Sequence, residues 1–160
     1  MKIMRKLLLI FLISISVSSI SQSFNDNKTS FSNFIKRMYI TTPFEGVKIV
    51  EDYERKYLVS VLSLDKAKYT NPSVMNRVAQ VKAQSQANTF LNGATITMDM
   101  VIKTTETKTK DSINTIIETI ESIKQNSMGF TQGLELLTNF ENSDGKRMVF
   151  VYMREMKVEK

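Results

Sequence analysis

Hydrophobic residues recur along this chain with two different periods, and the changes between these periods predict its elements. Between residues 30 and 42 the period is three to four, which is typical of an amphipathic helix. Thr29 or Ser30 can cap this short helix, and Pro43 limits it. One stripe of the helix is apolar and aromatic, at positions i, i+3, i+4, i+7 and i+8: Phe31, Phe34, Ile35, Met38 and Tyr39. We therefore expect a short amino-terminal amphipathic helix with one apolar face.

The period then shortens to two, as in β-strands. Residues 47–50 and 57–64 are rich in β-branched side chains and predict a first hairpin, which turns near Tyr53–Arg55. Residues 94–106 alternate between apolar and polar positions, so we expect one buried and one solvated face for this strand.

Residues 134–156 predict a second hairpin, here called the terminal hairpin. Its turn lies at Asn142–Gly145, a stretch rich in residues that accept turn geometry. Gly129 and Gly133 flank Phe130 just before its first strand. This spacing predicts a bulge or a close backbone approach at the entry to that strand.

Two longer helices are expected between the strands. The first begins at Asn71-Pro72, a cap followed by a proline at the first helical position, and it ends near Asn92-Gly93. Its alanines recur every four residues and let the helix lie close to a sheet: Ala79, Ala83 and Ala87. The second is capped by Asp111, ends by Asn126 and carries isoleucines on one stripe: Ile113, Ile116, Ile117, Ile120 and Ile123.

This order of elements predicts an α+β fold in a single domain over residues 30–160. We expect a mainly antiparallel sheet of about four to five strands, with the two main helices packed on one face. Residues 22–29 are polar, which predicts a flexible terminus before the amino-terminal helix.

Residues 1–21 have the pattern of an export signal. A basic start (Lys2, Arg5 and Lys6) precedes an apolar run at Leu7–Val17, and Ser19 and Ser21 supply small residues for cleavage. The apolar run is shorter than the roughly 20 residues that a membrane-spanning helix needs, so we interpret it as a cleaved signal peptide. The sequence therefore predicts an exported protein, either periplasmic or secreted.

Composition excludes several classes of function. The chain has no Cys, so it has neither disulfides nor the residue that anchors bacterial lipoproteins to lipid. It has 22 Lys and Arg against 16 Asp and Glu, and the two signs interleave, as in residues 51–56. A nucleic-acid-binding protein concentrates its cations on one face, so we do not expect nucleic acid as a partner.

The chain also has no His, which removes the usual general base and the commonest metal ligand. Carboxylates could still support hydrolysis, but no motif pairs the candidates, so a solvated surface is the favoured interpretation: Asp99, Glu135, Glu141 and Asp144. Methionine thioethers could bind Cu(I), although packing in an adaptable core is favoured: Met98, Met100, Met148, Met153 and Met156. No catalytic residue, metal site or cofactor is expected.

The order of features from Pro72 to about Glu155 resembles a known bacterial family. The shared features are the small-residue helix, the strand Ile96–Ile102, the second helix, the Ser127-x-Gly129-x-x-x-Gly133 segment and a closing hairpin with Asp144-Gly145 before Val149-Phe150-Val151. They are similar to the domain of small outer-membrane lipoproteins and of the amino-terminal part of a flagellar assembly protein. The resemblance implies a non-enzymatic envelope protein with helices against a small sheet. The lipid-bearing cysteine of that family is missing here, so a lipid anchor is not implied, and no functional residues are carried over.

These observations favour an exported, non-catalytic module that binds an envelope protein or assembles with itself. The expected surfaces are the terminal hairpin and the aromatic stripe: Phe31, Phe34, Ile35, Met38 and Tyr39. The stripe has two other uses, since it can cover the core of its own domain or lie on a membrane surface. The alternatives for the whole protein are a carboxylate-dependent hydrolase of an envelope polymer and a carrier of copper or another small ligand.

Overall fold

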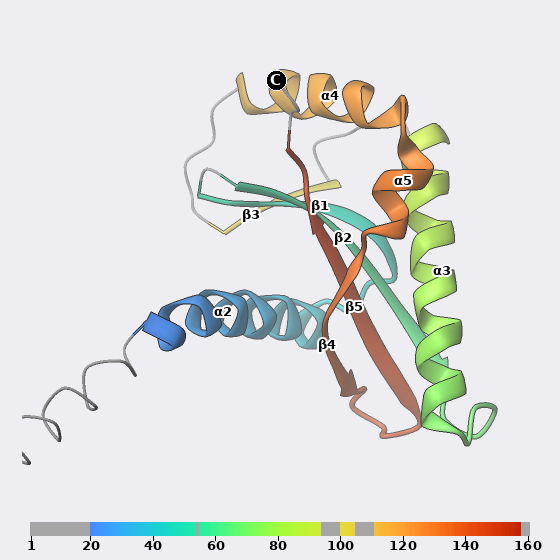
Figure 1. Cartoon of the computed structure of the whole chain (residues 1–160). Coiled ribbons are helices and arrows are strands. Elements are labelled where there is room, and N and C mark those ends of the chain that lie inside the picture. Colours follow the sequence, from blue (N-terminus) through green and yellow to red (C-terminus); the bar gives the residue numbers. More distant parts are fainter. Residues whose placement is uncertain (1–19, 54, 94–99, 105–110, 158–160) are drawn as a thin grey trace, which may run out of the picture. The chain divides into compact units, whose positions relative to one another are not determined.

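The computed structural model describes residues 20–53, 55–93, 100–104 and 111–157 of the 160-residue chain (Figure 1). The chain divides into two compact units, Met1–Thr41 and Thr42–Lys160. The described part of the first unit is one helix, and the second unit contains all of the described strands. The export-signal interpretation lies almost wholly outside the described residues, because these begin at residue 20.

Helix α2 (Ile20–Thr41) begins at Ile20, nine residues before Thr29, which is the earlier of the two expected caps. Residues 22–29, for which we expected a flexible terminus, are helical. The physical reason is that neither Gly nor Pro interrupts the sequence between Ile20 and Thr41. At its other end Thr41 Oγ1 donates to the carbonyl oxygen of Arg37 at 3.0 Å, and Pro43 follows.

The second unit is built on a five-stranded sheet in the order β3-β1-β2-β5-β4. Its strands are β1 (Gly46–Asp52), β2 (Arg55–Asp65), β3 (Val101–Lys103), β4 (Glu135–Glu141) and β5 (Arg147–Glu155). The two expected hairpins are present as the antiparallel pairs β1–β2 and β4–β5, and β2 also pairs antiparallel with β5. The first hairpin turns at Tyr53, where φ is 54°.

The sheet is mixed, which corrects our expectation of a mainly antiparallel sheet. Strand β3 runs parallel to β1, with Val101 opposite Ile49 and Lys103 opposite Glu51. A short hairpin loop forces two strands to be antiparallel, but β3 is separated from β1 by β2 and a long helix, so either direction is open to it. The alternating pattern identifies the residues that share one face of the sheet. It does not show whether the neighbouring strand runs parallel or antiparallel. Residues 94–99 of the expected strand lie outside the described residues.

Three helices accompany the sheet in this unit: α3 (Pro72–Gly93), α4 (Asp111–Lys124) and α5 (Ser127–Gln132). Helix α3 begins as expected, because Asn71 Oδ1 accepts hydrogen bonds from the backbone N–H groups of Ser73 and Val74 at 2.9 and 3.3 Å. Figure 1 shows α3 running along one side of the sheet, with α5 beside its carboxyl end. Helix–sheet packing of this kind confirms the α+β class.

The core lies between the sheet and these helices. It joins Leu58, Leu62 and Leu64 of β2 with the buried faces of α3 and α4 and with Phe150 and Tyr152 of β5. In α4 the stripe is narrower than expected, because Ile116, Ile120 and Ile123 are buried whereas Ile117 is 39% exposed. Ile117 lies about 100° around the helix from Ile116, at the edge of the buried face.

Helix α3 packs directly against β2. The three alanines on the inner face of α3 are completely buried: Ala79, Ala83 and Ala87. Ser60 of β2 is also completely buried, and its hydroxyl bonds to Gln86 Oε1 at 3.0 Å and lies 3.4 Å from the carbonyl oxygen of Ala83. The expectation that small residues let this helix lie close to a sheet is therefore confirmed.

We predict that Ala83→Leu lowers the free energy of unfolding by about 1–3 kcal/mol or more, because the larger side chain has to push α3 away from β2. Chemical denaturation followed by circular dichroism measures this change. Gln80→Leu adds a similar side chain on the exposed side of the same helix and should change stability by less than about 0.5 kcal/mol. Equal losses in the two variants would contradict the close approach.

Candidate functional site

Strand β4 forms one edge of the sheet. Among the strands that the structure describes, it pairs only with β5. The backbone N–H of Asn142 donates to the carbonyl oxygen of Arg147 at 3.0 Å, so Asn142 points its backbone groups toward β5. Backbone direction alternates along an antiparallel strand, and the register is regular from Asn142 back to Thr138. The backbone groups of Asn139 and Glu141 therefore point away from β5, toward the outer side of the edge.

A β-bulge interrupts the first half of this edge. The register of β4 against β5 shifts between Leu136 and Thr138, so Leu137 is the extra residue. Leu136, next to the bulge, is a large apolar side chain that is 39% exposed. A bulge twists a strand and ends regular pairing locally, which limits the regular edge to residues 138–141.

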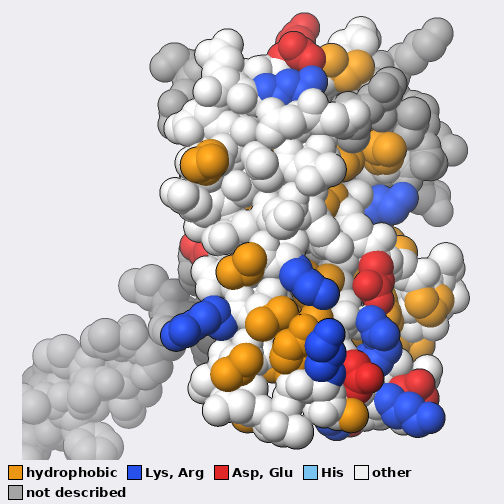
Figure 2. All heavy atoms as spheres, turned by 90° about the vertical axis from the view of Figure 1, so that its right-hand side faces the viewer, with side chains coloured by type: hydrophobic (Ala, Val, Ile, Leu, Met, Phe, Trp, Pro, Cys, Tyr) orange, Lys and Arg blue, Asp and Glu red, His pale blue; other side chains and the backbone are white. Residues whose placement is uncertain are grey.

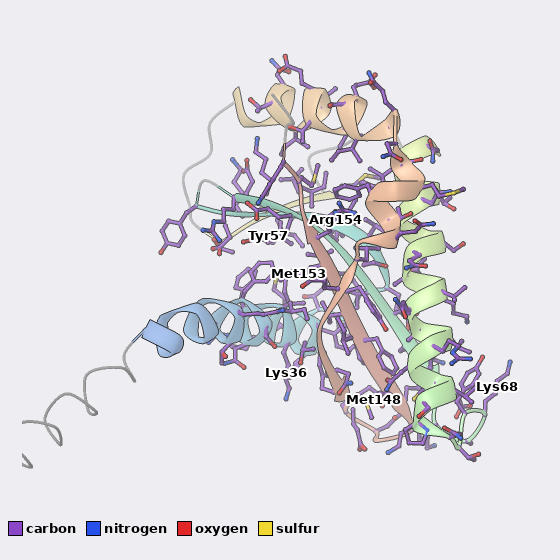
Figure 3. All side chains as sticks on the ribbon, viewed as in Figure 1. Lys36, Tyr57, Lys68, Met148, Met153 and Arg154 are labelled. Atoms are coloured by element: carbon purple, nitrogen blue, oxygen red, sulfur yellow. The ribbon has the colours of Figure 1, made fainter. Side chains whose placement is uncertain are left out.

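Arg154 of β5 contacts α5, the helix that precedes β4 (Figure 3). The guanidinium Nη1 donates to the carbonyl oxygen of Gly129 at 2.9 Å and to that of Phe130, and the guanidinium carbon lies 4.6 Å from the centre of the Phe130 ring. A Cβ atom on Gly133 would lie 2.1 Å from Arg154 Nη1, so only glycine leaves room for this side chain. A Cβ atom on Gly129 would likewise lie 2.6 Å from Asn126 Oδ1, so the close approach expected near Gly129 and Gly133 is found at both glycines.

The far end of the hairpin is closed by the expected turn. Asn142 Oδ1 accepts from the backbone N–H of Arg147 at 3.0 Å, and Asp144 Oδ1 accepts from that of Lys146 at 2.8 Å. Gly145 has a φ of 68°, which an L-amino acid with a side chain rarely adopts. β4 therefore lies between two restrained segments, α5 with its Arg154 contacts and this turn.

The five stripe residues lie on α2, at the spacing that puts them on one side of a helix: Phe31, Phe34, Ile35, Met38 and Tyr39. Their use as a partner surface stays a prediction. The candidate carboxylates do not meet, since Glu135 begins β4, Glu141 ends it and Asp144 lies in the turn. Glu141 instead pairs with Lys66 Nζ at 2.6 Å. Asp99 lies outside the described residues.

The methionines are spread over the molecule. Met156 is buried in the core, and Met100 and Met148 are partly buried against it. Met153 pairs with Val59 on the opposite face of the sheet, and Figure 3 shows it well apart from Met148 along β5. Met98 lies outside the described residues. Within the described ranges, no group of three or more His, Cys, Asp or Glu residues is arranged to hold a metal ion.

One polar cluster was not found from the sequence. Arg147 of β5 donates from Nε to Ser63 Oγ at 2.6 Å and from Nη2 to the carbonyl oxygen of Ser63 at 3.0 Å, and Ser63 Oγ in turn donates to Glu45 Oε1. Arg147 Nη2 also lies 3.7 Å from Glu45 Oε1. The cluster joins β2, β5 and the residue before β1. Its members are far apart in sequence, and a serine within an apolar strand was the only available signal.

Among the residues that the structure describes, Tyr152 and Arg55 have pKa values displaced from their usual range. Burial raises the pKa of Tyr152, whose hydroxyl donates to the carbonyl oxygen of Asn76 at 3.4 Å. A hydrogen bond to Tyr57 raises the pKa of the exposed Arg55 guanidinium, and the charge of Glu155 contributes. Neither group lies on the β4 edge, so neither supplies acid–base chemistry there.

No known protein family, no curated protein and no solved structure matches this chain. The helices in the part of the chain that the structure covers are all too short or too polar to cross a membrane.

We predict that Gly133→Ala displaces Arg154 and lowers the free energy of unfolding by about 1.5–3 kcal/mol, the usual contribution of hydrogen bonds from a charged group. Arg154→Ala should have a similar effect. The two changes act on the same contact, so the double variant should be destabilised by less than the sum of the two single losses. A double-mutant cycle from denaturation curves measures this coupling, and simple additivity would contradict it.

We predict a specific alkaline loss of stability from Tyr152. Its pKa in the folded protein lies above the ordinary value of about 10, so the folded state holds this proton more tightly than the unfolded state does. The resulting stabilisation is complete below pH 10 and is lost as pH rises through the folded pKa. The difference in free energy of unfolding between wild type and Tyr152→Phe should therefore shift in favour of the variant above pH 10. A pH-independent difference would contradict this.

Proposed function

We propose that this protein is an exported, non-catalytic module that binds a second protein by adding a strand to the β4 edge. The bound protein is another component of the cell envelope or a second copy of this chain. The observation that carries the proposal is the edge position of β4, with the backbone groups of Asn139 and Glu141 directed outward. Strand addition uses such groups for affinity and neighbouring side-chain contacts for specificity.

Three features of the edge support a restricted docking site. The regular part covers only residues 138–141, so a partner strand can add a few hydrogen bonds there without forming an extended ladder. Leu136 is exposed beside the bulge and offers an apolar contact at one end of this segment. The segment is paired with β5 and is followed directly by the restrained turn, so little ordering is needed when a partner binds.

The other parts of the proposal rest on the sequence. Export is inferred from the charged and apolar pattern of residues 1–21. The non-catalytic role is inferred from the lack of His and Cys in the whole chain, which removes the most common nucleophile and base pairs. The separation of Glu135 from Glu141 along β4 agrees with this inference, because glycoside hydrolysis needs two carboxyl groups on either side of one bond.

We predict that Asn139→Pro prevents strand addition while leaving the sheet folded. Proline removes the outward N–H of residue 139, and edge strands tolerate proline because that N–H makes no bond within the sheet. Asn139→Thr is the matched control, because it changes the side chain and keeps the N–H. A photoreactive amino acid at Leu136, introduced in the producing cell, should form a protein cross-link in the threonine variant and at least tenfold less in the proline variant.

The identity of the cross-linked protein, determined by mass spectrometry, separates a second copy from another envelope protein. Equal cross-linking in the proline and threonine variants would show that the β4 edge is not the docking site. No cross-link in either variant of a correctly exported protein would overturn the proposal as a whole.

A further inference from the structure

The outward face of α3 is apolar and basic. No Asp or Glu occurs between Asp65 and Asp99, a stretch that contains the whole of α3. Val74 and Val81 are 50% and 60% exposed on this helix. Figure 2 shows this side of the molecule, where hydrophobic side chains gather together with basic ones.

Helix geometry places these side chains in a defined pattern. At about 100° per residue, Val74 and Val81 lie within roughly 20° of each other, on the side of α3 opposite Ala83. Arg77 and Lys82 lie on the two flanks of this pair, and both are exposed. The outward face of α3 is therefore an apolar row between two cations, and we call it the α3 surface (Val74, Arg77, Val81 and Lys82).

The outward face of α4 has a net negative charge, with two acidic side chains and one basic one, Lys124. Glu118 and Glu121 are exposed and lie about one turn apart on the side facing away from the buried Ile116. Ile117 is 39% exposed beside them. Glu121 has an ion pair with Lys124 at 3.2 Å, and both side chains of that pair are accessible to solvent. We call this face the α4 surface (Ile117, Glu118 and Glu121).

We propose that the α3 surface of one copy docks onto the α4 surface of a second copy. Val74 and Val81 of one copy contact Ile117 of the next, and Arg77 and Lys82 face Glu118 and Glu121. The charge complementarity between two surfaces of the same chain points to a second copy as the occupant, since every copy carries both surfaces. The two surfaces differ, so the contact is head-to-tail and leads to a ring or an open chain of copies.

This contact is expected to be weak and sensitive to salt. Exposed ion pairs are individually weak, and they are screened as the Debye length falls from about 10 Å at 0.1 M salt to about 3 Å at 1 M. Self-association should therefore appear at high protein concentration in low salt and weaken at least tenfold in 1 M NaCl.

Charge reversal provides the test. In the α3-reversed variant (Arg77→Glu with Lys82→Glu) two acidic surfaces would meet. In the α4-reversed variant (Glu118→Lys with Glu121→Lys) two basic surfaces would meet. Sedimentation velocity should show that each variant alone associates at least tenfold more weakly than wild type. An equimolar mixture of the two should associate again, because each unlike pair of surfaces is then complementary. The chain with all four changes should also recover.

A double reversal away from both surfaces, Lys146→Glu with Lys157→Glu, controls for net charge and should associate like wild type. Thermal unfolding of every variant separates loss of association from loss of folding, and recovery in the mixture cannot arise from unfolded protein. A wild type that stays monomeric at all concentrations, or a mixture that fails to recover, would overturn the proposal.

Two further experiments distinguish this contact from binding to an anionic membrane and from strand addition at the β4 edge. Binding of monomeric wild type to phosphatidylglycerol vesicles but not to phosphatidylcholine vesicles, lost in the α3-reversed variant, would assign the α3 surface to an anionic membrane and overturn the second-copy proposal. The α3–α4 contact does not depend on the β4 edge. Asn139→Pro should leave it unchanged, and the α3-reversed variant should keep the cross-link from Leu136, so the two proposals can fail separately.

Discussion

The close approach of α3 to β2 is the contact on which the rest of the second unit depends. Three buried alanines, Ala79, Ala83 and Ala87, bring the helix backbone near enough for Ser60 to contact the carbonyl oxygen of Ala83. The larger buried side chains of α3 lie toward its two ends, Met75 at one and Phe90 with Leu91 at the other. On the opposite side of the same helix, Val74 and Val81 face solvent.

The terminal hairpin shows how a sheet edge can be kept in a fixed shape. Among the described strands β4 has β5 as its one neighbour, so interstrand hydrogen bonds restrain it on one side only. Further restraint comes from the segments on either side of β4. Arg154 forms hydrogen bonds with α5 before the strand, and the Asn142–Gly145 turn follows it. An edge that is rigid and short can discriminate between partners, whereas a long flat edge pairs with almost any extended chain.

The sequence predicted those elements whose cause is local. Asn71-Pro72 starts α3 and Gly145 permits the turn, and each depends on the backbone preference of the residue itself. The direction of β3 was not predictable from the sequence. Its neighbour in the sheet is β1, and β2 and α3 separate these two strands along the chain. The same holds for Arg154 with Gly133, where the glycine indicated a close approach without naming the partner. The Glu45–Ser63–Arg147 cluster joins three segments that are distant in sequence, so no local pattern predicted it.

Exposed apolar side chains are the common element of the surfaces that we assign to binding. Single exposed hydrophobic residues are normal on proteins and need no explanation. Val74 and Val81 differ from that background because they stack on one helix face between cations, and Leu136 differs because it lies beside an edge with outward backbone groups. In both places apolar area and directional polar groups occur together, and this combination gives a contact both affinity and specificity. These two surfaces are therefore distinguished by the polar neighbours of each apolar residue and not by its exposure alone.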